Sequence, residues 1–134
     1  MKIYNRLLAG NSWMAEYGDP DTADWSFLKR YSAYHNIDPT SSHTTYPPLL
    51  MTTSTRDDRV HPYHARCFVK RLLDVHETHQ SDHETIAKKF GRGSVYYYEN
   101  IEGGHGGAAD NKQQAFMNLL YLDFLAKTIG GGVM

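Results

Sequence analysis

The apolar positions along the chain follow two kinds of pattern, one typical of helices and one typical of strands, which take turns from segment to segment. Residues 23–34 and the segment after Pro62 carry apolar side chains at three- and four-residue steps, which is typical of helices that bury one face. Residues 49–53 and 94–99 are instead runs of strand-forming residues. A last helical stripe follows Asp110 and ends at three glycines. The pattern predicts the element order α-β-α-β-α and therefore an α/β fold with parallel strands.

Local signals support these boundaries. Asp38-Pro39 ends the first helix, and Asp110 with Gln113 resembles a capping box at the start of the last one. Residues 49–53 are apolar at consecutive positions, which predicts a central strand covered on both faces. Two strands are too few for an independent sheet, so we expect the missing strands to be replaced by self-association, by another polypeptide or not at all.

Two candidate catalytic residues follow the two predicted strands. Asp57 or its neighbour Asp58 follows the first strand, and His105 lies among glycines after the second. In open α/β sheets, catalytic groups gather in loops at the carboxyl ends of strands. An acid followed by a histidine is the second half of the α/β-hydrolase triad, whose serine comes earlier in the chain. We therefore expect the chain to begin after that serine.

The serines of the chain do not supply an obvious nucleophile. No Gly-x-Ser-x-Gly turn occurs in the sequence. Ser12 and Ser94 follow glycines closely, but neither lies between a predicted strand and a predicted helix. The acid and the base of a triad are thus present without their partner.

Composition excludes several classes of protein. The 134 residues suffice for one domain, and the net charge of -1 without a Lys/Arg cluster argues against nucleic acid or an acidic membrane surface as a partner. No apolar run approaches the length of a membrane span. Cys67 is the sole cysteine, which excludes an intrachain disulfide. We expect a cytoplasmic protein.

Four stretches of the chain together resemble the carboxyl-terminal part of the catalytic domain of the prolyl oligopeptidase family of serine peptidases. They are residues 12–18, 31–36, 55–62 and 98–107, so the resemblance covers nearly the whole chain. It implies that residues 1–134 form a partial α/β-hydrolase domain with an incomplete sheet. The family's nucleophile elbow and β-propeller precede the matched part and are not in this sequence.

The resemblance implies the catalytic roles. The first aspartate of the Asp-Asp-Arg run, Asp57, matches the triad acid, and His105 matches the general base. The implied activity is hydrolysis of short peptides after proline, with no cofactor. Because the nucleophile is missing, we expect the chain alone to be inactive and to need the upstream part of the same enzyme, or self-association, as its partner.

The resemblance also implies how a proline-containing peptide is bound. Arg59 matches an arginine that hydrogen-bonds a substrate carbonyl, and Val60 matches a residue that lines the proline pocket. Trp13 offers a flat apolar face for the proline ring, and Tyr17, one helical turn later, helps to close the pocket.

Two alternative functions remain open from the sequence. A metal-binding module is one, because His76, His79 and His83 share a helical spacing and His61 and His64 form a second pair. No HExxH run supports it, so we assign no metal site. The other alternative is a noncatalytic interaction fragment, which the missing nucleophile and the open sheet edges would suit.

Overall fold

The computed structural model describes residues 1–38, 46–78 and 95–129, and its elements confirm the predicted order. The elements in chain order are the short 3-10 helices η1 (Tyr4–Arg6) and η2 (Leu8–Trp13), the helices α1 (Met14–Tyr17), α2 (Trp25–Tyr31) and α3 (Ala33–Asn36), strand β1 (Leu49–Ser54), helix α4 (Tyr63–Thr78), strand β2 (Val95–Asn100) and helix α6 (Asn111–Ile129).

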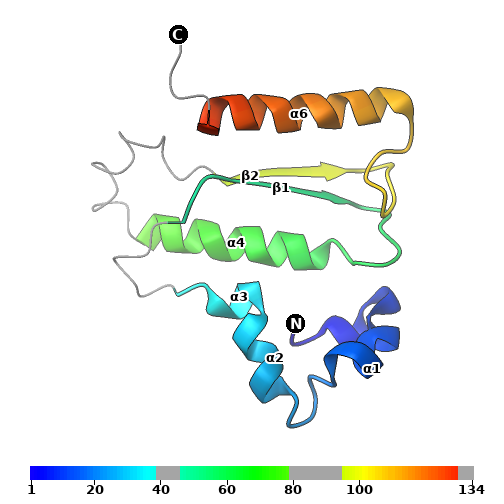
Figure 1. Ribbon diagram of the computed structural model, residues 1–134, viewed down its shortest axis with the longest axis vertical. Helices are drawn as coiled ribbons and strands as arrows, with labels where there is room; N and C mark the ends of the chain where they lie inside the picture. Colours follow the sequence, from blue (N-terminus) through cyan, green and yellow to red (C-terminus); the bar gives the residue numbers. More distant parts are fainter. Residues whose placement is uncertain (39–45, 79–94, 130–134) are drawn as a thin grey trace.

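The two strands form a parallel pair between two helical layers. Their register runs from Leu49 opposite Val95 to Ser54 opposite Asn100. Helix α6 lies on one face of the pair and α4 on the other, with α3 packed against α4 (Figure 1). The crossover helix α4 allows the two strands to run in the same direction.

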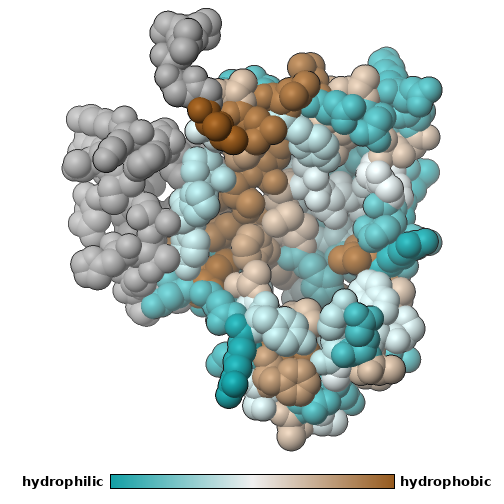
Figure 2. Space-filling view, in the orientation of Figure 1, coloured by the Kyte–Doolittle hydropathy of each residue, from teal (hydrophilic) through white to brown (hydrophobic). Residues whose placement is uncertain are grey.

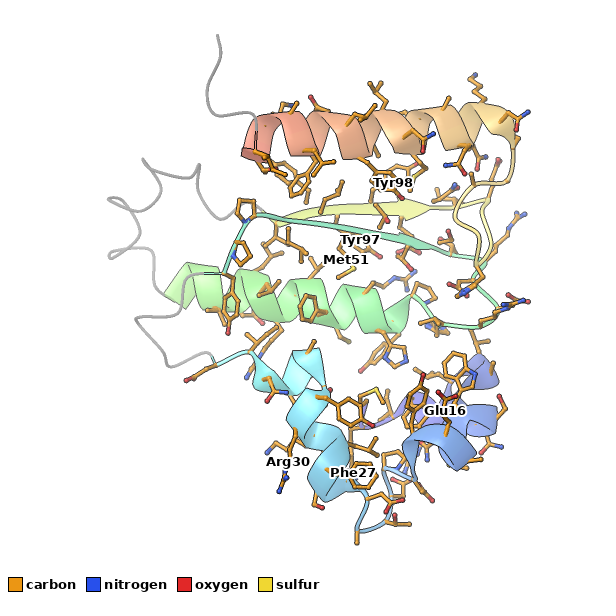
Figure 3. All side chains as sticks on the ribbon, viewed as in Figure 1. Glu16, Phe27, Arg30, Met51, Tyr97 and Tyr98 are labelled. Atoms are coloured by element: carbon orange, nitrogen blue, oxygen red, sulfur yellow. The ribbon has the colours of Figure 1, made fainter. Side chains whose placement is uncertain are left out.

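Successive side chains of β2 point alternately toward the two helical layers. Tyr96 and Tyr98 contact the rings of Phe124 and Phe116 on α6, while Tyr97 and Glu99 point to the α4 side. Figure 3 shows Tyr98 between β2 and α6, and Met51 between the strands and α4. Both faces of the sheet are therefore covered by helices.

A small apolar core holds α4 against the sheet and against the end of α3. Leu72 and Val75 of α4 are buried with Ile37, and half-buried side chains from both strands, Leu49 and Val95, pack on them. The three- and four-residue apolar spacing after Pro62 thus produces the helix face that the sequence predicts.

The predicted helix over residues 23–34 is wrong at its start, because α2 begins at Trp25, and at Ser32, where the helix is interrupted. Ser32 has an extended backbone (ψ 105°) and separates α2 from α3. Its carbonyl and those of Lys29 and Arg30 accept hydrogen bonds from the Asn36 amide, at 2.9, 3.1 and 2.9 Å. Because Asn36 satisfies carbonyl groups that a helix end leaves free, the chain can turn at Ser32.

The prediction of a central β1 is not met within the described residues. There β1 pairs with one strand, β2, and its residues Leu49–Thr53 are half-buried rather than buried. The apolar character of both faces of β1 is nevertheless used, because helices cover them.

Candidate active site

Both candidate loops leave the sheet at the same edge. Ser54 and Asn100 are the last residues in register, and the Thr55 N–H donates to the Asn100 carbonyl at 2.8 Å, which extends the pairing beyond the strands. The loop after β1 leads to α4 and the loop after β2 leads to α6 (Figure 1). Parallel pairing in this register therefore brings the loops of Asp57 and His105 together.

Asp57 and His105 are in direct contact. The His105 Nδ1 atom lies 3.0 Å from each of the two Asp57 carboxylate oxygens. The Asp57 side chain is 11% exposed and that of His105 is 44% exposed. A partly buried acid thus holds an imidazole that is still open to the surroundings, and the ring contacts Asp57 rather than the exposed Asp58.

The Asp57 carboxylate is fixed by the chain that follows it. Its Oδ1 atom accepts the backbone N–H groups of Arg59 and Val60 at 2.9 and 2.8 Å. Burial alone would raise the pKa of Asp57, but the N–H groups of Val60 and Arg59, together with His105, hold that pKa below its ordinary value. The carboxylate is ionised at neutral pH, as a partner for an imidazolium must be.

Glycines shape the loop that carries His105. The Gly107 N–H donates to the Gly104 carbonyl at 2.9 Å, and Gly107 has a φ of 90°. A Cβ atom on Gly103 would lie 1.8 Å from the Gly107 carbonyl oxygen. The close backbone approach at Gly103 and the left-handed conformation at Gly107 explain why the loop needs glycine at these two positions.

Sequence reasoning missed Asn100, the last residue of β2. Its side chain is buried and makes four hydrogen bonds, two of them to Gly107 and Gln113. The signal available in the sequence is an asparagine directly between a strand and a glycine-rich loop.

Sequence reasoning also missed an ionic cluster around Glu99, the residue before Asn100 in β2. Glu99 accepts hydrogen bonds from Arg66 on α4 at 2.9 and 2.5 Å, from Thr55 at 2.6 Å and from Tyr97 at 2.5 Å. These donors, Arg66 first, lower the pKa of Glu99 to about 2. The cluster connects α4, β2 and the residue that begins the Asp57 loop.

A cleft of about 890 Å³ opens beside the pair. Asp57 and His105 line it together with Trp13, Tyr17 and Val60, three of the four residues expected to bind substrate. Aromatic and aliphatic side chains such as Tyr31 and Phe68 extend the apolar wall. The fourth expected residue, Arg59, is exposed and lies outside the cleft lining.

The metal-binding alternative falls largely on residues that the structure leaves out. His79 and His83 lie outside the described residues, as does the side chain of His76. Within the described ranges, no three residues of the kinds that hold metals come together. In the same ranges, no helix has both the length and the apolar character needed to cross a membrane.

The arrangement defines a class of protein. The described elements form part of an α/β-hydrolase domain. They are, in chain order, a strand, the loop with Asp57, a crossover helix, a second strand parallel to the first, the loop with His105 and a covering helix. Residues 3–132 match the prolyl oligopeptidase family, and the chain belongs to that family.

Relatives and a solved structure agree with this assignment. An uncharacterized peptidase of Sinorhizobium fredii is 40% identical over 116 residues, which are 86% of this chain and 13% of the relative. A prolyl endopeptidase of Elizabethkingia miricola is 29% identical over 132 residues, 97% of this chain and 16% of that enzyme.

A structure from a study of two prolyl endopeptidases is similar over 98% of this chain, with a TM-score of 0.79 and 28% sequence identity, and the matched part is 17% of that protein. The fold is thus the carboxyl-terminal portion of an α/β-hydrolase domain with an incomplete sheet. The chain spans about one seventh of the length of these relatives.

Proposed function

We propose that this chain supplies the acid and the general base of a serine peptidase that cleaves short peptides after proline. The observation that carries the proposal is the contact of His105 Nδ1 with both carboxylate oxygens of Asp57 at 3.0 Å. Membership of the prolyl oligopeptidase family supports the peptidase chemistry. The prolyl endopeptidase relative supports the preference for proline.

In this proposal each polar atom of the pair has a task. With Nδ1–H donated to Asp57, the other ring nitrogen of His105, Nε2, carries the lone pair that takes the proton of a serine hydroxyl. The same nitrogen later returns the proton to the leaving amine. Asp57, already ionised and fixed by two backbone N–H groups, stabilises the imidazolium between these steps.

The cleft supports recognition of an apolar residue next to the scissile bond. Trp13 offers a flat face for a proline ring, and Tyr17 and Val60 line the same cleft. Arg59 is exposed and directly precedes Val60, which lines the cleft, and in this proposal its guanidinium donates to a substrate carbonyl.

The nucleophile has to come from polypeptide outside these 134 residues. The sequence holds no Gly-x-Ser-x-Gly turn, and the hydrogen bonds of the His105 ring in the described structure go to Asp57 and not to a serine. We therefore propose that the chain alone does not turn over peptide, and that the upstream part of the same enzyme is its partner. A cytoplasmic location stays a prediction.

The test is a chimera in which residues 1–132 replace the matching segment of the Elizabethkingia miricola prolyl endopeptidase, which supplies the serine. We expect this chimera to hydrolyse a chromogenic proline-containing peptide. Asp57→Asn should lower kcat about 10⁴-fold, because the imidazole loses the acceptor that fixes its tautomer. His105→Gln should abolish turnover.

Asp58→Asn is the matched control, because it removes the same charge one residue away from the contact. It should leave kcat within about twofold of the parent chimera. The proposal is wrong if Asp57→Asn and Asp58→Asn have equal effects. It is also wrong if a chimera with native circular dichroism and native thermal midpoint is inactive.

A further inference from the structure

The side-chain amide of Asn100 is buried, and all of its hydrogen-bond donors and acceptor sites have partners. Its side chain lies at the end of β2, and the residue is 4% exposed. The Nδ2 group donates to the Gly107 carbonyl at 2.7 Å and to Gln113 Oε1 at 2.8 Å. The Oδ1 atom accepts the N–H groups of Glu102 and Gly103, both at 3.1 Å. Two donors and two acceptor sites are all that an amide side chain offers.

Three of these four bonds go to the backbone of the loop that carries His105. The acceptor side holds the entry of the loop at Glu102 and Gly103, and the donor side holds its exit at Gly107. Between these points, the Gly107 N–H closes a turn onto the Gly104 carbonyl at 2.9 Å. His105 lies inside this turn, so the Asn100 amide spans the base of the segment that presents the imidazole.

The fourth bond fixes the orientation of the Asn100 amide itself. Gln113 Oε1 accepts from Asn100 and also from the Ala109 N–H at 2.9 Å, and its backbone N–H donates to the Asp110 carboxylate at 2.8 Å. This is the capping arrangement at the start of α6. The Nε2 group of Gln113 also donates to the Glu102 carboxylate at 2.7 Å. The helix start therefore acts as the rigid support for Asn100.

The backbone of Asn100 connects the same residue to the acid loop. Its carbonyl accepts the Thr55 N–H at 2.8 Å, two residues before Asp57. A single residue thus ties the start of the Asp57 loop through its main chain and both ends of the His105 loop through its side chain.

From this arrangement we propose that Asn100 is the positioning residue for His105, and that its four hydrogen bonds hold the imidazole against Asp57. The inference rests on the proposed function, in which that contact fixes the tautomer of the general base. Asn100 does not touch the imidazole, so its effect reaches the reaction through the loop. Because a misplacement of about 1 Å can cost about 100-fold in rate, the loss of these bonds should be measurable.

The test measures the tautomer of neutral His105 in the full chain by long-range ¹H–¹⁵N NMR. In the unmodified chain, the proton should be on Nδ1, facing Asp57. Asn100→Leu has a similar volume and no hydrogen bonds, and it should convert His105 to a mixture of tautomers. Asn118→Leu is the control, because Asn118 is an exposed asparagine on α6 whose side chain contacts Gln114, and it should leave the tautomer unchanged.

Asp57→Asn separates the two proposals. If the unmodified chain lacks the Nδ1–H form, or if Asp57→Asn keeps it, the proposed function fails. If Asp57→Asn loses the form while a folded Asn100→Leu keeps it, the Asn100 proposal alone is overturned. Should Asn100→Leu not fold, Asn100→Asp decides in the same way, since it keeps the shape and the acceptors and removes both donors.

The chimera described above gives the kinetic counterpart. Asn100→Asp should lower kcat about 10- to 100-fold with little change in KM, because a displaced base affects the transition state and not the binding of substrate. A loss confined to KM, or an unchanged kcat, would overturn the proposal.

Discussion

Ser54 and Asn100 are the last residues paired between β1 and β2, and both donate to the same carbonyl, that of Gly107, at 3.2 and 2.7 Å. Both residues are buried, at 3% and 4% exposed. The end of the sheet therefore holds the exit of the His105 loop from two adjacent strands. This relationship explains how a glycine-rich loop can hold His105, the proposed general base, at a fixed place.

Ser54→Ala should have a small effect on stability. The substitution removes the longer of the two bonds and leaves the Gly107 carbonyl bonded to Asn100, so we expect the free energy of unfolding to fall by about 0.5–1 kcal/mol. Urea unfolding measures this change. Ser12→Ala, which removes an exposed hydroxyl bonded to the Ala9 carbonyl, is the control. A loss above about 2 kcal/mol would contradict this, because it would show that the remaining bond from Asn100 is not enough to hold the Gly107 carbonyl.

Gly103→Ala should be far more damaging than Gly106→Ala. A Cβ atom on Gly103 would meet the Gly107 oxygen at 1.8 Å and the Asn100 amide at 2.9 Å, whereas one on Gly106 has nothing within 4 Å. We expect Gly103→Ala to lower the free energy of unfolding by more than 2 kcal/mol and Gly106→Ala to change it by less than about 0.5 kcal/mol. Equal thermal midpoints for the two variants would contradict the described loop.

The sequence predicted those parts of the fold that depend on a local pattern of residue types. The strand-forming run at 49–53 predicted the strand, the helical spacing after Pro62 predicted the crossover helix, and the glycines around His105 predicted the histidine loop. The choice of Asp57 over Asp58 as the candidate acid followed from a family resemblance. Spacing in the sequence does not distinguish two neighbouring aspartates in one turn.

The remainder depended on contacts between distant parts of the chain. Asn100 and Glu99 belong to residue types that are usually exposed, and their bonds to Gln113 on α6 and to Arg66 on α4 depend on how β2 packs against these helices. The break at Ser32 was missed for a different reason: its contacts are local, but the bonds from the Asn36 amide to three backbone carbonyls do not show in the spacing of apolar residues. Helix propensity alone favours continuation there.

The pKa of Asp57 should stay below its ordinary value even without its partner. Two backbone N–H groups, of Val60 and Arg59, contribute to lowering it besides His105. In His105→Ala, ¹³C NMR of the carboxyl carbon should therefore still show a depressed pKa. Because the folded pKa is lowered, this carboxylate stabilises the fold above its unfolded pKa of about 3.9, and the contribution is lost as the pH falls through the folded value. A normal pKa in His105→Ala would show that the imidazole alone was responsible.

Glu99→Gln should weaken the protein at neutral pH but not at acid pH. The pKa of Glu99 is lowered from 4.5 to about 2, so its carboxylate stabilises the fold above pH 4.5 and this contribution disappears as the pH falls toward 2. Arg66 is half exposed, and solvent screening limits the expected loss to about 1 kcal/mol at pH 7. Urea unfolding at pH 7 and pH 2 tests this, with the exposed Glu16→Gln as control. An equal difference from the unmodified chain at both pH values would refute it.

The last prediction concerns the apolar side chains that the described structure leaves exposed. Leu119, Leu122 and Ile129 are 62%, 65% and 75% exposed at helical spacing on α6, and Figure 2 shows apolar surface extending from this helix across the strands. A parallel pair of strands with such a helix face favours association over an isolated monomer. We therefore expect the chain alone to self-associate, with a thermal midpoint that rises with protein concentration.

Analytical ultracentrifugation and thermal melts over a hundredfold dilution test this expectation. Leu122→Gln should weaken association about tenfold or more, because burial of one leucine contributes about 1.5–3 kcal/mol. Leu73→Gln, at a 40% exposed leucine on α4, is the matched control and should leave association nearly unchanged. A compact monomer with a concentration-independent midpoint would show that these helices and two strands bury enough apolar surface to be stable alone.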